Sequence, residues 1–165
     1  METFQLSKFY IRQKQLDQKI LHQHNLTFDK TLKLRILALL IELGELANET
    51  RMFKFWSQNQ KIKRKQLILE YIDCFHFFLS LGNYFHGRQK QIYFVRSKNL
   101  TIPNLLLKIF QETSQLINHF SLQQYQKAFQ LFLNLSSGFK ITNPLLKKYY
   151  LQKYKENIKR QKNKY

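Results

Sequence analysis

The sequence predicts an all-α fold, a helical bundle of about five to six helices built around a central metal-binding helix pair. The chain of 165 residues contains only 4 Gly and 2 Pro, so it has few chain punctuators and favours long helices. Apolar residues recur at helical spacing, and no stretch shows the alternation typical of a strand. With 44% hydrophobic and 15% aromatic residues, the chain can build one core, and we expect residues 1–165 to form a single domain.

Three helices are expected in the first half of the chain. The first covers about residues 4–22, where Phe9, Leu16 and Ile20 lie near helical spacing. The second starts at a cap formed by Asp29 or Thr31 and ends at about residue 51. A basic, polar stretch at residues 57–65 is expected to be a loop. The third helix, at about residues 66–85, is apolar and aromatic on most faces and is therefore expected at the centre of the bundle.

Cap signals divide the second half of the chain. A Thr-Ile-Pro sequence at residues 101–103 predicts the start of a helix that runs to about residue 116. Residues 121–124 fit a capping box, and Gly138 fits a helix end. Asn143 followed by Pro repeats the cap-plus-proline signature, and a basic C-terminal segment follows it.

The positive charge of the chain admits two interpretations. The formal net charge is +18 and the pI about 10.1, which is typical of proteins that bind polyanions. The charge is, however, spread from Lys8 to Lys164 instead of being confined to one arm. We therefore attribute most of it to biased composition and do not expect nucleic-acid binding.

The sequence also predicts a cytoplasmic protein. Cys74 is its one cysteine, which excludes an internal disulfide and fits a reducing compartment. The N-terminus lacks a basic region followed by an apolar run, so no signal peptide is expected. The longest apolar runs, such as residues 37–41, are too short to span a membrane.

Half of the few carboxylates gather on the second and third expected helices. Of 10 Asp and Glu residues, these two helices carry Glu42, Glu45, Glu49, Glu70 and Asp73. The first three fall at i, i+3 and i+7, one stripe of a helix, and the last two repeat the i, i+3 spacing. All five lie among apolar neighbours, where unpaired charge is costly.

Three arrangements would offset this charge. Buried salt bridges need cations, and these helices offer few, Arg35 and Arg51 being nearest in sequence. A di-iron site of the ferritin type needs Glu-x-x-His, but only Asp73 has a histidine, His76, three residues on. Mg²⁺ binds several carboxylate oxygens and bridges them to substrate phosphates. We therefore favour a magnesium site over salt bridges.

The same residues resemble a known family. Glu42-Leu-Gly-Glu45 and Glu70-Tyr-Ile-Asp73 resemble the E-x-x-E and E-x-x-D signature of the all-α NTP pyrophosphatases. Longer strings at residues 42–49, 53–57 and 70–77 resemble the dimeric dUTPase family, in its bacterial and phage branch.

The two ends of the chain extend the resemblance. Residues 13–17 resemble the first motif of that family and residues 150–161 its last. The similarity covers about residues 10–85 and 146–165, and the latter is expected to be a basic segment that closes over substrate. The region between them matches only as helices of suitable length.

The resemblance implies Mg²⁺-dependent hydrolysis of dUTP to dUMP and pyrophosphate, with dUDP also hydrolysed. By carry-over, two or more Mg²⁺ ions would be held by Glu42, Glu45, Glu70 and Asp73. Bound metal would orient the phosphates and lower the pKa of an attacking water. Glu45 would take the proton of that water, with Glu49 as an additional acidic participant.

The resemblance also implies a set of substrate-binding residues. Gln13 would bind uracil by paired amide contacts and Trp56 by ring packing, and Asp17 stands where related sequences often carry Asn. His76 and Phe77 would pack near the sugar, with core filling as the alternative. The phosphates would be reached by residues of the C-terminal segment, namely Lys153, Asn157, Arg160 and, as a closing residue, Tyr165.

Two rival functions remain open from the sequence alone. One is an all-α pyrophosphatase that acts on dCTP or on a broader set of nucleotides. The other is a basic helical nucleic-acid-binding protein without enzymatic activity, which leaves the acidic stripe unexplained. Helices that are apolar on most faces in so short a chain indicate burial by a partner, and the resemblance implies a homodimer.

Overall fold

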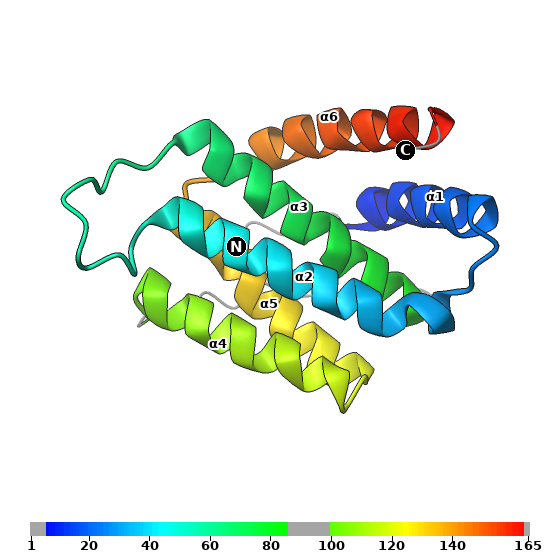
Figure 1. Cartoon of the computed structure of the whole chain (residues 1–165), viewed down its shortest axis with the longest axis horizontal. Coiled ribbons are helices and arrows are strands. Elements are labelled where there is room, and N and C mark those ends of the chain that lie inside the picture. The colour runs from blue at the N-terminus through cyan, green and yellow to red at the C-terminus, as the bar shows by residue number, and fades with distance from the viewer. Residues whose placement is uncertain (1–5, 86–99, 164–165) are drawn as a thin grey trace.

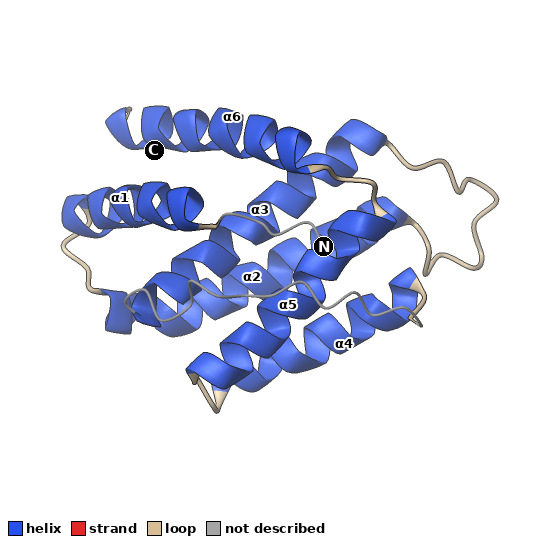
Figure 2. Ribbon diagram, turned by 180° about the vertical axis from the view of Figure 1, so that it is seen from behind, coloured by secondary structure: helices blue, strands red, loops and turns tan. Residues whose placement is uncertain are grey.

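The computed structural model describes residues 6–85 and 100–163, which form six α-helices and contain no strand (Figures 1 and 2). This confirms the predicted all-α fold. The helices are α1 (Ser7–Gln23), α2 (Phe28–Thr50), α3 (Arg64–Gly82), α4 (Ile102–Ser114), α5 (Leu122–Gly138) and α6 (Asn143–Lys162). Single 3-10 turns follow α3 at Asn83–Phe85 and α4 at Gln115–Ile117.

Thr27 begins α2, so the expected caps Asp29 and Thr31 were wrong. The Thr27 hydroxyl oxygen accepts a hydrogen bond from the Lys30 backbone nitrogen at 3.4 Å. Asp29 instead lies in the first turn, where a carboxylate faces the positive end of the helix dipole. The helix ends at Arg51, which is left-handed at φ 57°.

The expected capping box at the start of α5 is only half formed. The Ser121 hydroxyl accepts from the Gln124 backbone nitrogen at 3.3 Å, as predicted. The Gln124 side chain does not return to Ser121 but donates to Glu112 on α4, at 2.8 Å to its carbonyl and 2.9 Å to its carboxylate. Gln124 therefore ties the start of α5 to α4.

The last helix also begins one residue earlier than expected. Thr142 is extended and occupies the N-cap position of α6 without a side-chain capping bond, whereas Asn143 is the first helical residue, so Asn143 was wrong as the cap. Before it, α5 ends at Gly138 as predicted, but Lys140, at φ 51°, supplies the left-handed turn.

The third helix is central, as predicted. It packs against α1, α2, α5 and α6, and its contact with α2 is the most extensive in the fold. In Figure 1, α2 and α3 run through the middle, with α1 and α6 on one side and α4 and α5 on the other. The segment between α2 and α3 extends well away from the bundle.

Aromatic packing fixes α1 and α6 to the same side of α3. The Phe9 ring of α1 packs edge-on against Phe75 at 5.4 Å and against Tyr150 of α6 at 4.8 Å. Tyr150 also stacks on His76 of α3, with ring centroids 4.4 Å apart. Polar residues of α1 and α6 next to these rings are thereby held against one edge of α3.

One apolar stripe on α2 stays at the surface. Leu34, Leu37 and Ile41, spaced three and four residues apart, are 64%, 54% and 54% exposed. Among the described helices, none is both long enough and apolar enough to cross a membrane. Within residues 6–85 and 100–163, no helix covers this apolar stripe.

Candidate functional site

A cavity of about 420 Å³ lies between α1, α2, α3 and α6. The cavity has two different ends along α2 and α3, which run antiparallel. Arg35 of α2 meets Ser80 of α3 at one end. Glu42 follows Arg35 by seven residues and Asp73 precedes Ser80 by seven, so this second pair lies about 10 Å further along the helix axes. Apolar side chains cover the walls between the ends, namely Leu16, Ile20, Leu21, Leu26, Leu34 and Phe77. The lining therefore combines a polar end with an end that carries both acidic and basic side chains, Glu42, Asp73 and Lys153.

The first end is built on α1 and α3 and carries two predicted site residues from the first motif. Gln13 and Asp17 lie one turn apart on α1, and the Gln13 amide nitrogen donates to the Asp17 carboxylate at 3.0 Å. The Gln13 amide oxygen lies 2.6 Å from His76 Nδ1. Gln13, Asp17 and His76 are therefore one buried network, and Phe77 lines the cavity beside them.

His76 is neutral in this setting. Burial lowers its pKa to about 3, and the neighbouring charge of Lys153 acts in the same direction. Its ring lies parallel to Tyr150, which accounts for the aromatic packing expected at this position.

Arg35 is the site residue at this end that the sequence analysis did not assign. Its guanidinium lies 3.3 Å from the Asp17 carboxylate and also donates to the hydroxyls of Thr31 and Ser80. Burial raises the pKa of Asp17, and Arg35 opposes that rise. A single arginine within an apolar helix was the signal in the sequence, but its partner on α1 is not adjacent along the chain.

At the other end, three of the expected metal ligands converge. Glu42, Glu45 and Glu70 each place a carboxylate oxygen so that all three lie within 4.8 Å of one another. Glu45 and Glu70 also line a second hollow of about 370 Å³, together with Glu49. Glu42, Glu45 and Glu49 share one face of α2 through their i, i+3 and i+7 spacing. Glu70 meets this face from α3.

This convergence raises the affinity of the carboxylates for protons. The pKa of Glu42 rises to about 7 because of burial and the charges of Asp73, Glu45 and Glu70. Burial likewise raises the pKa of Glu70, although Gln66 donates to it. Carboxylates that retain protons for lack of positive charge are the donor set that a hard divalent cation needs, so these residues fit Mg²⁺.

Asp73, the fourth expected ligand, has a different partner. Lys153 of α6 donates to its carboxylate at 2.7 Å, while burial raises the pKa of Asp73. Among described residues, ion pairs go to Asp17, Asp73, Glu112 and Glu156 rather than to the three converging glutamates. The salt-bridge alternative therefore describes Asp73 but leaves Glu42, Glu45 and Glu70 without a cation.

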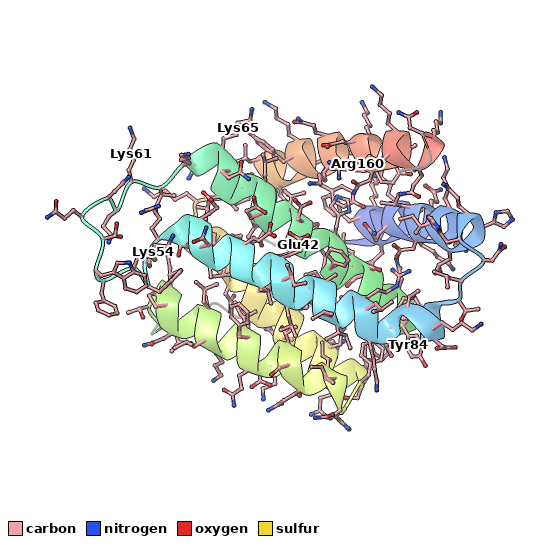
Figure 3. The ribbon with its side chains drawn as sticks, viewed as in Figure 1. Glu42, Lys54, Lys61, Lys65, Tyr84 and Arg160 are labelled. Atoms are coloured by element: carbon pink, nitrogen blue, oxygen red, sulfur yellow. The ribbon has the colours of Figure 1, made fainter. Side chains whose placement is uncertain are left out.

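The C-terminal residues reach the same end of the cavity. Lys153, Asn157 and Arg160 fall at i, i+4 and i+7 on α6 and all line the cavity. Arg160 also donates to Glu156 at 2.7 Å. Figure 3 shows Arg160 between α6 and α1, and Glu42 where α2 approaches α3. Tyr165 lies outside the described residues.

Trp56 does not line this cavity. It belongs to the segment between α2 and α3, is 66% exposed and packs edge-on against Phe55 at 5.0 Å. The structure thus brings together all other described residues of the predicted substrate set but leaves Trp56 apart from them.

Comparison with known proteins adds a family. A family model described as dUTPase matches residues 5–165 of this chain. No curated protein and no solved structure matches the chain.

Glu42→Gln should change how stability without metal depends on pH. The raised pKa of Glu42 means that the wild-type fold is favoured at low pH and loses that contribution as pH rises from about 4.5 through about 7. Glutamine cannot ionise, so the melting temperature of the variant should exceed that of wild type by more at pH 8 than at pH 5, in EDTA.

Asp29→Asn, which removes a carboxylate outside the cluster, serves as the control and should keep the wild-type pH dependence. Saturating Mg²⁺ should raise the melting temperature of wild type more than that of Glu42→Gln. Parallel pH profiles for wild type and Glu42→Gln would show that the carboxylates do not strain the fold.

Proposed function

Because this chain belongs to the dUTPase family, we propose that it converts dUTP to dUMP and pyrophosphate in the cavity, with Mg²⁺ on the carboxylates of α2 and α3. Membership of the family makes the protein an enzyme that hydrolyses dUTP. The observation that carries the finer proposal is the two-ended cavity: a polar wall, in which Arg35 pairs with Asp17, faces a cluster of acidic and basic groups across apolar sides. Its volume of about 420 Å³ is in the range of small-molecule sites.

Mg²⁺ would be held by Glu42, Glu45, Glu70 and Asp73, which already converge or adjoin. When bound, the metal supplies charge that orients the phosphates and makes water a better nucleophile. We assign to Glu45 the role of accepting the proton of an attacking water, because Glu45 is the exposed member of the cluster and solvent can reach its carboxylate. Glu49, one turn further along α2, lines the hollow next to it.

The phosphates are assigned to α6. Lys153 bonds Asp73 and therefore lies beside the metal-binding carboxylates, and Asn157 and Arg160 extend the same face of the helix. Charge-assisted hydrogen bonds to phosphate are about twice as strong as neutral ones. A basic face next to an acidic cluster is what a metal–triphosphate complex requires, since each set matches one half of that complex.

The base is assigned to the opposite end. The Gln13 amide offers both a donor and an acceptor, as an imide edge requires. Trp56 is exposed and does not line the cavity of its chain. For Trp56 to pack on the base, the segment between α2 and α3 must move toward this cavity or approach the cavity of a second chain.

The substrate prediction concerns a panel of nucleotides. With Mg²⁺, the protein should release pyrophosphate from dUTP in strong preference to dTTP, dCTP and UTP, measured by a coupled pyrophosphate assay. EDTA should stop the reaction, because without metal the carboxylates repel the triphosphate. Equal turnover of all four nucleotides would contradict the specificity but leave pyrophosphatase activity standing.

Arg160→Ala should lower kcat/KM for dUTP by tenfold or more, since a lost charge-assisted phosphate contact costs about 1.5–3 kcal/mol. Lys159→Ala removes the adjacent charge, which does not line the cavity, and should stay within about twofold. Steady-state kinetics at two salt concentrations would separate a specific contact from general electrostatic attraction. If only general attraction acts, high salt abolishes the loss of kcat/KM in both variants. Point substitutions are preferable to truncation at Tyr150, because that ring belongs to the core.

We also propose that the protein is a homodimer. Two exposed apolar surfaces support this: the stripe of Leu34, Leu37 and Ile41 on α2 and the aromatic side chains beside Trp56. Sedimentation velocity at micromolar concentration should show a dimer. Leu37→Lys should shift it to monomer, whereas Leu107→Lys, on α4 and even more exposed, should not. A wild-type monomer would contradict the proposal.

A further inference from the structure

The hydrogen bonds at the polar end of the cavity run in one direction. An ionised carboxylate only accepts, so the Gln13 group 3.0 Å from Asp17 Oδ1 is the amide nitrogen. The amide oxygen then faces His76 Nδ1 at 2.6 Å. Because an amide oxygen also only accepts, Nδ1 carries the proton of the neutral imidazole. Asp17 thus sets the orientation of Gln13, and Gln13 sets the tautomer of His76.

Arg35 supports the ionised form of Asp17 on which this direction depends. Its Nη1 lies 3.3 Å from the same carboxylate oxygen that Gln13 bonds. Two further bonds, to the hydroxyls of Thr31 and Ser80, hold the guanidinium in place. The carboxylate therefore receives one cation and one N–H, both of which favour its charged form.

Reversing the Gln13 amide would be costly. Its oxygen would face the Asp17 carboxylate, so that hydrogen bond would be lost, and its nitrogen could bond His76 only after the imidazole proton had moved to Nε2. Gln13 is only 4% exposed, so little water can replace the lost bond. Leaving buried polar groups unpaired costs about 1–3 kcal/mol for each group.

The Gln13 amide retains hydrogen-bonding capacity toward the cavity. After bonding its two neighbours it keeps one lone pair and one N–H, and Gln13 lines the cavity. Asp17 Oδ2 and His76 Nε2 are closed off from solvent, which fits residues that act through Gln13.

The orientation of this amide distinguishes uracil from cytosine. Uracil presents N3–H beside a carbonyl, which pair with the oxygen and the N–H of the amide. Cytosine presents an unprotonated N3 beside an amino group, so in the same position an acceptor would meet an acceptor and a donor a donor. Only a reversed amide would pair with cytosine.

We propose that Asp17 and His76 are positioning residues that hold the Gln13 amide in the orientation that accepts uracil and rejects cytosine. Neither residue needs to touch the base for this effect. The inference rests on the proposed function, in which Gln13 contacts the base. Specificity then comes from the two contacts that turn repulsive with the wrong base.

The test compares kcat/KM for dUTP and dCTP in wild type and Asp17→Leu. Leucine has no acceptor, so it releases the Gln13 amide, and the dUTP:dCTP ratio should fall at least tenfold. A purely structural effect would instead lower kcat/KM for both nucleotides alike. Melting temperatures of both proteins would verify folding.

Gln13→Ala supplies the matched background. If Asp17 acts through Gln13, Asp17→Leu should leave the ratio unchanged once Gln13 has been removed. An undiminished effect in that background, or an unchanged ratio in the single variant, would overturn the proposal.

His76→Phe tests the other side of the amide and serves if Asp17→Leu does not fold. It keeps a ring against Tyr150 but removes the Nδ1–H donor, and it should lower the ratio in the same direction. An unchanged ratio with His76→Phe would count against the orientation argument. The dUTP:dCTP ratio of the wild-type protein is measured before that of any variant. A wild-type protein without preference for dUTP over dCTP would contradict the proposed function instead.

Discussion

The repulsion among Glu42, Glu45 and Glu70 is the constraint on which the site depends. Their carboxylate oxygens converge within 4.8 Å, between the two helices that make the most extensive contact in the fold. Hydrophobic packing of α2 on α3 holds these charges together, and it raises the pKa of Glu42 to about 7. Bringing these three carboxylates together therefore lowers the stability of the fold, and a bound cation would offset the loss.

The rest of the bundle supplies what that cluster lacks. Phe9, Phe75 and Tyr150 fix α1 and α6 on one edge of α3, which brings a polar wall and a basic face to the two ends of one cavity. Lys153 illustrates the connection, because it neutralises Asp73 and also stands beside the remaining acids. The proposed function therefore draws the metal, phosphate and base contacts from different helices, and α3 packs against each of these helices.

Local patterns accounted for the fold class and for the acidic stripe. Helical periodicity and scarce Gly and Pro act within a few residues, so they predicted α3 as central and placed the α2 glutamates on one face. Caps were less accurate: Thr27 and Thr142 begin their helices rather than Asp29, Thr31 or Asn143, because neighbouring polar residues compete for the same role.

The sequence by itself determined an all-α chain, its family resemblance and the residues that carry charge or hydrogen bonds. Tertiary structure alone decided their partners: Lys153 meets Asp73 across 80 residues, and Gln13 meets His76 across 63. It also pairs Arg35 with Asp17 in a salt bridge and leaves Trp56 outside the cavity. Spacing along a helix fixes which residues share a face, but which faces meet depends on how the helices pack around one core.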